Sequence, residues 1–186
     1  MKGSSRRRER FGYFGRVLWV SLVGALIAGL YGALHDQVTY SIGPEYYTHL
    51  KFEQFYYTAR IEPVRLRVAA IGFLASWWVG FGIALLLAIR LSSCSEPRAF
   101  FRAVAVRVLI VLAFALAAGI TGYAYGLMKG GDDPFRGWEH VQSELGVRDL
   151  AAFVRVAYIH NATYLGAFVG LVVVFVGTRR SSTGAS

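Results

Sequence analysis

Apolar and polar residues follow one another along this chain in long blocks, without the short alternation of a sheet. Four blocks contain no Asp, Glu, Lys or Arg, and they hold 19, 22, 21 and 23 residues. A helix needs about 20 apolar residues to cross the hydrocarbon core of a bilayer. Backbone polar groups cannot stay unpaired in lipid, so each block is expected to be helical. The sequence predicts an all-α protein, a four-helix transmembrane bundle with helices at about 14–35, 68–91, 103–128 and 156–178.

Small residues recur at every fourth position of the predicted helices. The clearest rows are Gly24, Ala28 and Gly32; Gly72, Ser76 and Gly80; and Ala118, Gly122 and Gly126. Small side chains at this spacing let helix backbones approach closely in lipid. The rows predict tight helix–helix contacts, and the short segment between the second and third helices predicts that these two are antiparallel neighbours.

The basic residues are distributed unevenly along the chain. It has 186 residues, with 20 Lys and Arg against 11 Asp and Glu, which gives a net charge of +9. With the N-terminus in the cytoplasm, the cytoplasmic segments carry about +10 and the outer segments about −1. Such a bias sets the orientation of a membrane protein and favours anionic lipid headgroups as partners. We therefore expect both termini in the cytoplasm and no nucleic-acid partner.

Two polar tails and two outer loops complete the predicted organisation. The tails cover 1–13 and 179–186, and the outer loops cover 36–67 and 129–155. Gly43-Pro44 reads as a helix start, so we expect a helix from 44 to about 57 that places Glu45 and His49 on one face. A shorter helical piece is expected at 138–145. The single cysteine, Cys94, falls in the cytoplasmic loop, so no intrachain disulfide is expected.

The candidate chemistry gathers on the outer side. All four histidines and nine of the eleven acids map there. Imidazole and carboxylate groups together suit transition-metal ions. The sequence predicts a metal or polar-ligand site at the outer end of the bundle. Its candidate ligands are His35, Asp36, Glu45, His49 and His160, with a weaker second pair in His140 and Glu144.

The donor types do not distinguish between zinc, copper, iron and manganese. A b-type haem between His35 and His160 is a further alternative, while no c-type haem attachment motif is present. A histidine at a helix end also often serves only as a hydrogen-bonding residue.

Three functional classes remain open at this stage. The first is the site just described. The second is a non-catalytic structural or assembly subunit of a larger membrane complex, whose small-residue faces contact other chains or further copies. The third is an oligomeric channel or transporter component, although no predicted helix is broken by proline as in transporter half-helices. The sequence shows no nucleophile and base at a spacing that supports catalysis, so an enzyme is the less favoured class.

Two segments carry a resemblance. These are HDQVTYSI at 35–42 with PEYYT at 44–48, and HNATYLG at 160–166. They resemble segments of an uncharacterised family of bacterial four-helix integral membrane proteins. The resemblance implies a multi-pass protein of the bacterial inner membrane and brings no activity, cofactor or partner with it.

Overall fold

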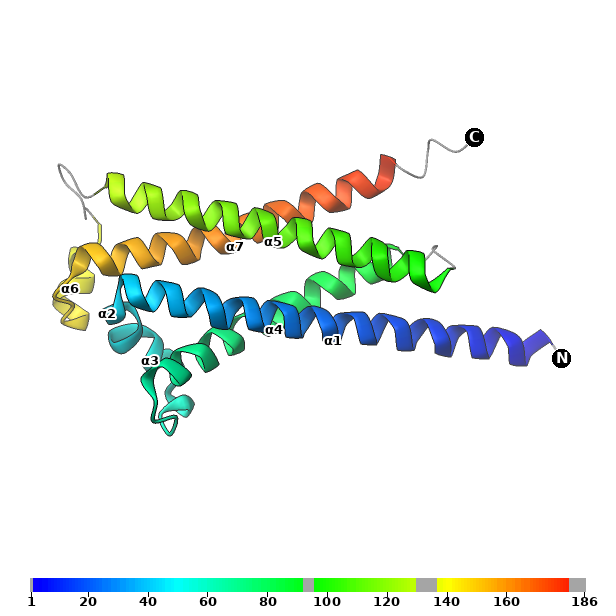
Figure 1. The fold of residues 1–186 in the computed structure, drawn as a ribbon, viewed down its shortest axis with the longest axis horizontal. Helices are drawn as coiled ribbons and strands as arrows, with labels where there is room; N and C mark the ends of the chain where they lie inside the picture. Colours follow the sequence, from blue (N-terminus) through cyan, green and yellow to red (C-terminus); the bar gives the residue numbers. More distant parts are fainter. Residues whose placement is uncertain (1, 92–95, 130–136, 181–186) are drawn as a thin grey trace.

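The computed structural model describes residues 2–91, 96–129 and 137–180, and Cys94 lies outside them. Four long helices and several short ones make up the described chain, which contains no strand there (Figure 1). The long helices are α1 (Lys2–Ile42), α4 (Val64–Arg90), α5 (Pro97–Met128) and α7 (Leu150–Arg180). Each is long and apolar enough to cross a membrane. The protein is therefore an all-α, multi-pass membrane protein with a four-helix bundle.

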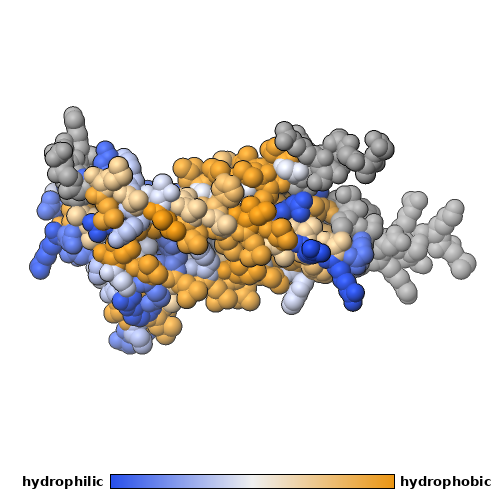
Figure 2. Space-filling model, turned by 45° about the horizontal axis from the view of Figure 1, so that its top comes forward, coloured by the Kyte–Doolittle hydropathy of each residue, from blue (hydrophilic) through white to orange (hydrophobic). Residues whose placement is uncertain are grey.

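Both ends of the chain lie at one end of the bundle, and the short helices lie at the other (Figure 1). An apolar band occupies the middle of the surface in Figure 2, with polar residues towards the two ends. This division matches a slab of hydrocarbon between two aqueous faces. We refer to the two ends as the outer end, which carries the short helices, and the inner end, which carries the termini.

The bundle consists of two closely packed helix pairs, α1 with α4 and α5 with α7. In the first pair, Gly24 faces Gly80 and Ala84, and Gly32 faces Gly72 and Ser76. The small-residue rows expected from the sequence thus interlock across this pair. Backbones that approach so closely gain dispersion contacts along the whole interface.

The second pair also packs closely through small residues. Gly122 lies against Tyr158 and Ala162, and Gly166 lies against Phe114 and Ala118. The two pairs touch each other much less. The expected neighbours α4 and α5 meet near the inner end, where Leu87 and Leu91 pack in one apolar cluster with Phe100 and Val104.

Several helix bounds differ from those expected. Helix α1 begins at Lys2 and continues to Ile42, where 14–35 was expected after a separate tail. Arginine is a good helix former, and no proline or glycine interrupts the chain between 33 and 42. Helices α4, α5 and α7 likewise begin four to six residues before the expected starts at 68, 103 and 156. Helix α5 starts earlier because the Glu96 carboxylate caps it by accepting the amides of Arg98 and Ala99.

The first outer loop is not one continuous α-helix from 44 to 57. It forms α2 (Pro44–Tyr46), a π-helical turn η1 (Tyr47–Lys51), α3 (Phe52–Gln54) and the 3-10 turn η2 (Tyr56–Thr58). The guanidinium of Arg67 at the start of α4 lies 3.8 Å from the Phe52 ring centroid and donates to Thr58. The second outer loop contains α6 (Glu139–Leu145), as expected.

Candidate metal site between α1 and α7

The candidate site lies where the outer ends of α1 and α7 face each other. Because α1 continues through residue 42, His35, Asp36 and Thr39 all project from one regular helix. Helix α1 ends at Ile42, and the next residue, Gly43, approaches Ala152 so closely that no side chain fits: a Cβ there would lie 2.7 Å from the Ala152 carbonyl oxygen. This contact fixes the end of α1 against α7, which carries His160.

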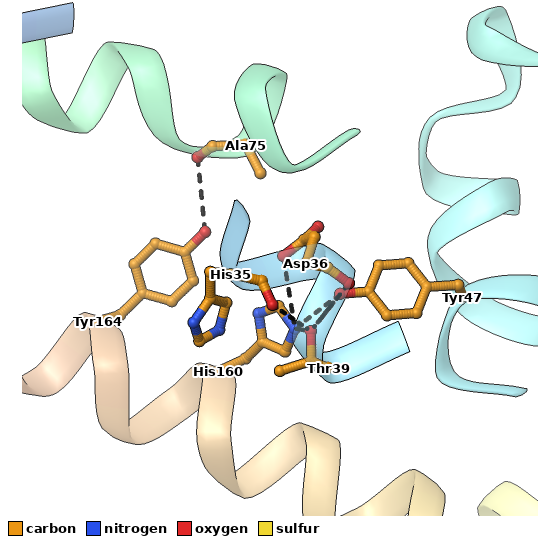
Figure 3. A network of polar contacts seen from close by, with 7 residues as sticks. All are labelled: His35, Asp36, Thr39, Tyr47, Ala75, His160 and Tyr164. Atoms are coloured by element: carbon orange, nitrogen blue, oxygen red, sulfur yellow. Dashed lines mark hydrogen bonds and ion pairs between the residues drawn. The ribbon is translucent and has the colours of Figure 1, made fainter. Parts of the chain in front are cut away.

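His35, Asp36 and His160 form a compact cluster of donor groups (Figure 3). One ligand atom from each residue lies within 4.8 Å of the other two. The Nε2 atom of His160 lies 3.8 Å from Oδ1 of Asp36, and the His35 and His160 rings meet edge to face at 4.9 Å between centroids. Asp36 and His160 are only 4 % and 7 % exposed. Two imidazoles and a carboxylate are thus held together within the membrane-spanning part of the bundle.

Two tyrosines of the first outer loop cover this cluster. Tyr46 stacks on the His160 ring at 5.1 Å, with an angle of 16° between the planes. The Tyr47 hydroxyl lies 3.3 Å from His160 Nε2 and 2.6 Å from Thr39 Oγ1, which itself donates to the His35 carbonyl. Burial raises the pKa of both tyrosines, and the nearby Asp36 charge raises them further. Both phenols therefore stay protonated and act as neutral hydrogen-bonding groups beside the cluster.

His35 has a different environment from His160. Its ring stacks on Tyr31 at 5.7 Å between centroids. Its buried Nε2 atom has no hydrogen-bond partner among the described residues. Buried polar atoms in proteins are almost always paired, because an unpaired one costs about 1–3 kcal/mol. The His35 nitrogen is therefore available to a ligand.

A cavity of about 80 Å³ opens beside the cluster and runs inward between the two helix pairs. Its outer end is polar, with His35, Asp36, Lys51, His160 and Tyr164 in its wall. A single water needs about 10–15 Å³ of such space, so the cavity has room for a few small molecules or one polar group. The Tyr164 hydroxyl reaches across to the Ala75 carbonyl at 3.5 Å and bridges α7 and α4 on this side (Figure 3).

Two of the five first-choice ligands lie elsewhere. The Glu45 carboxylate accepts the backbone amides of Arg148 and Asp149, at 3.0 and 2.7 Å. His49 Nδ1 lies 2.7 Å from the Leu145 carbonyl oxygen. Both side chains thus connect the first outer loop to the second and lie outside the cluster.

The weaker pair, His140 and Glu144, lies exposed on α6. The three-residue cluster around His35 contains neither of them. The haem alternative also lacks space, because the edge-to-face contact between the His35 and His160 rings leaves no gap for a porphyrin between them.

Sequence reasoning missed Thr39, Tyr46, Tyr47 and Lys51 as members of this region. Tyrosine and lysine are common at membrane interfaces, and threonine is common within membrane helices, so composition gives no signal for these four. Tyr46 and Tyr47 could have been found from their position directly after Gly43-Pro44, which turns the chain back over the bundle. Lys51 could not, because its direction depends on the π-helical turn.

The fold and the cluster define a multi-pass all-α membrane protein with a buried histidine–carboxylate group near one end. No protein-family model, curated protein or solved structure matches the chain.

Proposed function

We propose that this is a multi-pass protein of the bacterial inner membrane that binds a transition-metal ion through His35, Asp36 and His160, near the extracytoplasmic face. The observation that carries the proposal is the gathering of three donor atoms within 4.8 Å in a buried position. The basic inner face then contacts anionic lipid headgroups.

The donor set and its spacing suit the same four ions that the sequence predicts. Two imidazoles and one carboxylate suit zinc, iron(II), manganese or copper(II), and no thiolate takes part. Metal–ligand distances of about 2.0–2.2 Å place neighbouring tetrahedral donors roughly 3.4 Å apart. The three side chains therefore close by roughly 1 Å around an ion, which side-chain rotation can supply. Three protein ligands leave one position open, as in sites that bind a further ligand.

Tyr47 and Thr39 support the site from outside the ligand set. Metal-bound histidines usually have their orientation fixed by a second hydrogen-bonding group, and the loss of such a group typically weakens metal binding 10–100-fold. In this protein the Tyr47 hydroxyl contacts Thr39 and His160 Nε2, the nitrogen that lies 3.8 Å from Asp36 Oδ1. A metal ion bound by that nitrogen takes the place of its contact with Tyr47, while Tyr47 keeps its hydrogen bond to Thr39 beside the site.

The assembly-subunit alternative retains one specific observation in its favour. Glu45 and His49 do connect the outer loops to each other. An oligomeric channel or transporter component gains no such support from this chain, whose inner end is filled by the apolar cluster that contains Leu87, Phe100 and Val104.

The test is metal analysis of detergent-purified protein that carries an affinity tag without histidine. After incubation with each candidate ion and dialysis, we expect about one ion per chain in the unaltered protein. His35→Ala is the decisive variant, because His35 Nε2 makes no hydrogen bond whose loss would unfold the protein. We expect His35→Ala to lower metal affinity at least about tenfold. Loss of a group that only supports a ligand typically lowers affinity about 10–100-fold, and loss of a ligand itself should have at least as large an effect.

The matched control is His140→Ala, which removes an exposed histidine from the same outer side. It should bind metal like the unaltered protein. Folded protein that takes up none of the four ions would refute the proposal, and so would a His35→Ala variant with unchanged metal content. Either result would favour the assembly role.

A further inference from the structure

Lys51 occupies an unusual position at the outer rim of the cavity. It ends the π-helical turn η1, and its ammonium lies 5.7 Å from the Tyr46 ring centroid and 5.9 Å from that of Phe55. A π-helical turn is uncommon and often marks a functional position. Burial lowers the pKa of Lys51, and the charge of Asp36 partly offsets this shift. The side chain thus lies half-buried, with its charge directed at the same cavity as the cluster.

The charges in this cavity balance only while no metal is bound. Among the described residues of its wall, Asp36 is the only acid and Lys51 the only lysine or arginine. A divalent ion bound by Asp36 and two neutral imidazoles leaves a net charge of +2 together with Lys51. The surrounding walls are apolar, and an uncompensated charge in such surroundings is very unfavourable. A metal-loaded site therefore requires an anion.

The apolar part of the cavity wall indicates that the anion also carries an apolar group. Beyond the polar rim the wall becomes apolar, with Ile83, Val108, Val111 and Leu112. The wall extends along α1 from His35 to Gly24, which is ~16 Å at 1.5 Å per residue. The cavity, at about 80 Å³, therefore suits a charged oxygen group together with the first few carbon atoms of an aliphatic chain.

We propose that the cavity binds the head of an amphiphile with an anionic oxygen group, a carboxylate or a phosphate, placed between the metal ion and Lys51. The first carbon atoms of its chain lie in the cavity, and the rest of the chain lies in the apolar groove between α1 and α5. This inference rests on the proposed metal site, whose open position the head group fills. The oxygen anion donates an electron pair to the metal and pairs with the ammonium, and no covalent bond is broken.

A lateral groove offers such a molecule a path from the bilayer. The groove lies between α1 and α5, and it shares Tyr31 and His35 with the cavity. The rest of its wall is almost entirely apolar, with Val38, Ile42 and Ile120 among its residues. A lipid-soluble anion can therefore approach the site from the outer interface, whereas a free anion has no comparable apolar anchoring.

The test uses cobalt(II) as the probe metal, because its visible absorption reports a change of ligands. Cobalt-loaded protein in neutral detergent is titrated with dodecyl phosphate and, separately, with inorganic phosphate. We expect dodecyl phosphate to shift the cobalt bands at a concentration at least tenfold lower than inorganic phosphate. Lys51→Gln should weaken the dodecyl phosphate response at least tenfold without lowering cobalt affinity, because it removes a positive charge beside the metal ion, and Lys51→Arg should restore the response.

Lys129→Gln is the matched control. Its ammonium also lies over a tyrosine ring, 5.6 Å from the Tyr125 centroid, but it is exposed and outside the cavity wall. An unaltered response in Lys51→Gln, or an equal effect of both substitutions, would overturn the role of Lys51. Equal responses to the two phosphates would overturn the amphiphile. Failure of the unaltered protein to bind cobalt would instead refute the metal site on which the inference rests.

Discussion

Replacing Gly24 with alanine tests whether the α1–α4 interface depends on small residues at fixed positions. A Cβ atom on Gly24 would lie 2.5 Å from the Ala84 Cβ and 2.8 Å from the Gly80 carbonyl oxygen. Carbon atoms in contact prefer 3.5–4.0 Å, so the two helices must separate by about 1 Å to admit the methyl group. Because the small residues of both helices interlock in one row, this separation weakens the contacts around Gly32 and Gly72 as well.

The size of the effect follows from two opposing contributions. Overpacking a close contact costs about 1–3 kcal/mol. Alanine in place of glycine inside a helix returns about 1 kcal/mol of helix propensity. Gly82→Ala is the control, since a Cβ on Gly82 meets nothing within 4 Å and the variant gains only the propensity. The propensity cancels between the two variants, so Gly24→Ala should be about 1–3 kcal/mol less stable than Gly82→Ala.

The measurement is reversible unfolding in mixed micelles, followed by circular dichroism while the fraction of denaturing detergent rises. A difference of 1–3 kcal/mol changes the folded-to-unfolded ratio by a factor of about 5 to 150, which is well within reach of the assay. Equal stability of the two variants would refute the reasoning, because the α1–α4 interface would then tolerate a methyl group where the structure leaves no space for one.

Two further predictions concern the outer loops. Glu45→Ala removes two charge-assisted hydrogen bonds to the amides of Arg148 and Asp149, worth roughly 1.5–3 kcal/mol together after allowance for their exposure. Those two amides should exchange hydrogen about 10–100-fold faster, whereas the exposed control Glu53→Ala should leave them unchanged, and an equal effect of both would contradict the contact. Burial raises the pKa of the Tyr47 hydroxyl in the folded protein above its value of about 10 in the unfolded chain. The protonated hydroxyl therefore contributes to the free energy of unfolding below about pH 10, and this contribution is lost as the pH rises further. Tyr47→Phe should therefore lose less stability than the unaltered protein between about pH 9 and about pH 11, while the exposed control Tyr56→Phe should behave like the unaltered protein.

The membrane helices and their close contacts were predictable because each follows from a strong, local pattern. An uncharged block of about 20 residues has one low-energy state in lipid, and small residues four apart necessarily share a helix face. The row that starts at Gly24 also predicted correctly that Gly32 packs on a neighbouring helix. Pairing is harder to infer, because the small-residue rows recur on several helices and do not by themselves specify which partner each one meets.

The membership of the cluster was predictable only in part, and the reason lies in the first outer loop. Glu45 and His49 share a face on a regular α-helix, which made them plausible partners of His35. The π-helical turn η1 widens the spacing between 47 and 51 and changes the direction of every side chain after it. Whether a turn contains this extra residue depends on packing against distant residues such as His160. No local pattern in the sequence encodes it.

The position of the cluster follows from how the bundle is assembled. His35 and Asp36 belong to the α1–α4 pair, whereas His160 belongs to the α5–α7 pair. Within each pair, interlocking small residues hold the helices at a fixed separation, but between the pairs the contacts are sparse and a cavity intervenes. Neither pair alone can bring the three donors together. A ligand that joins them must also bind the two halves of the bundle to each other, so its binding and the packing of the whole molecule are energetically linked.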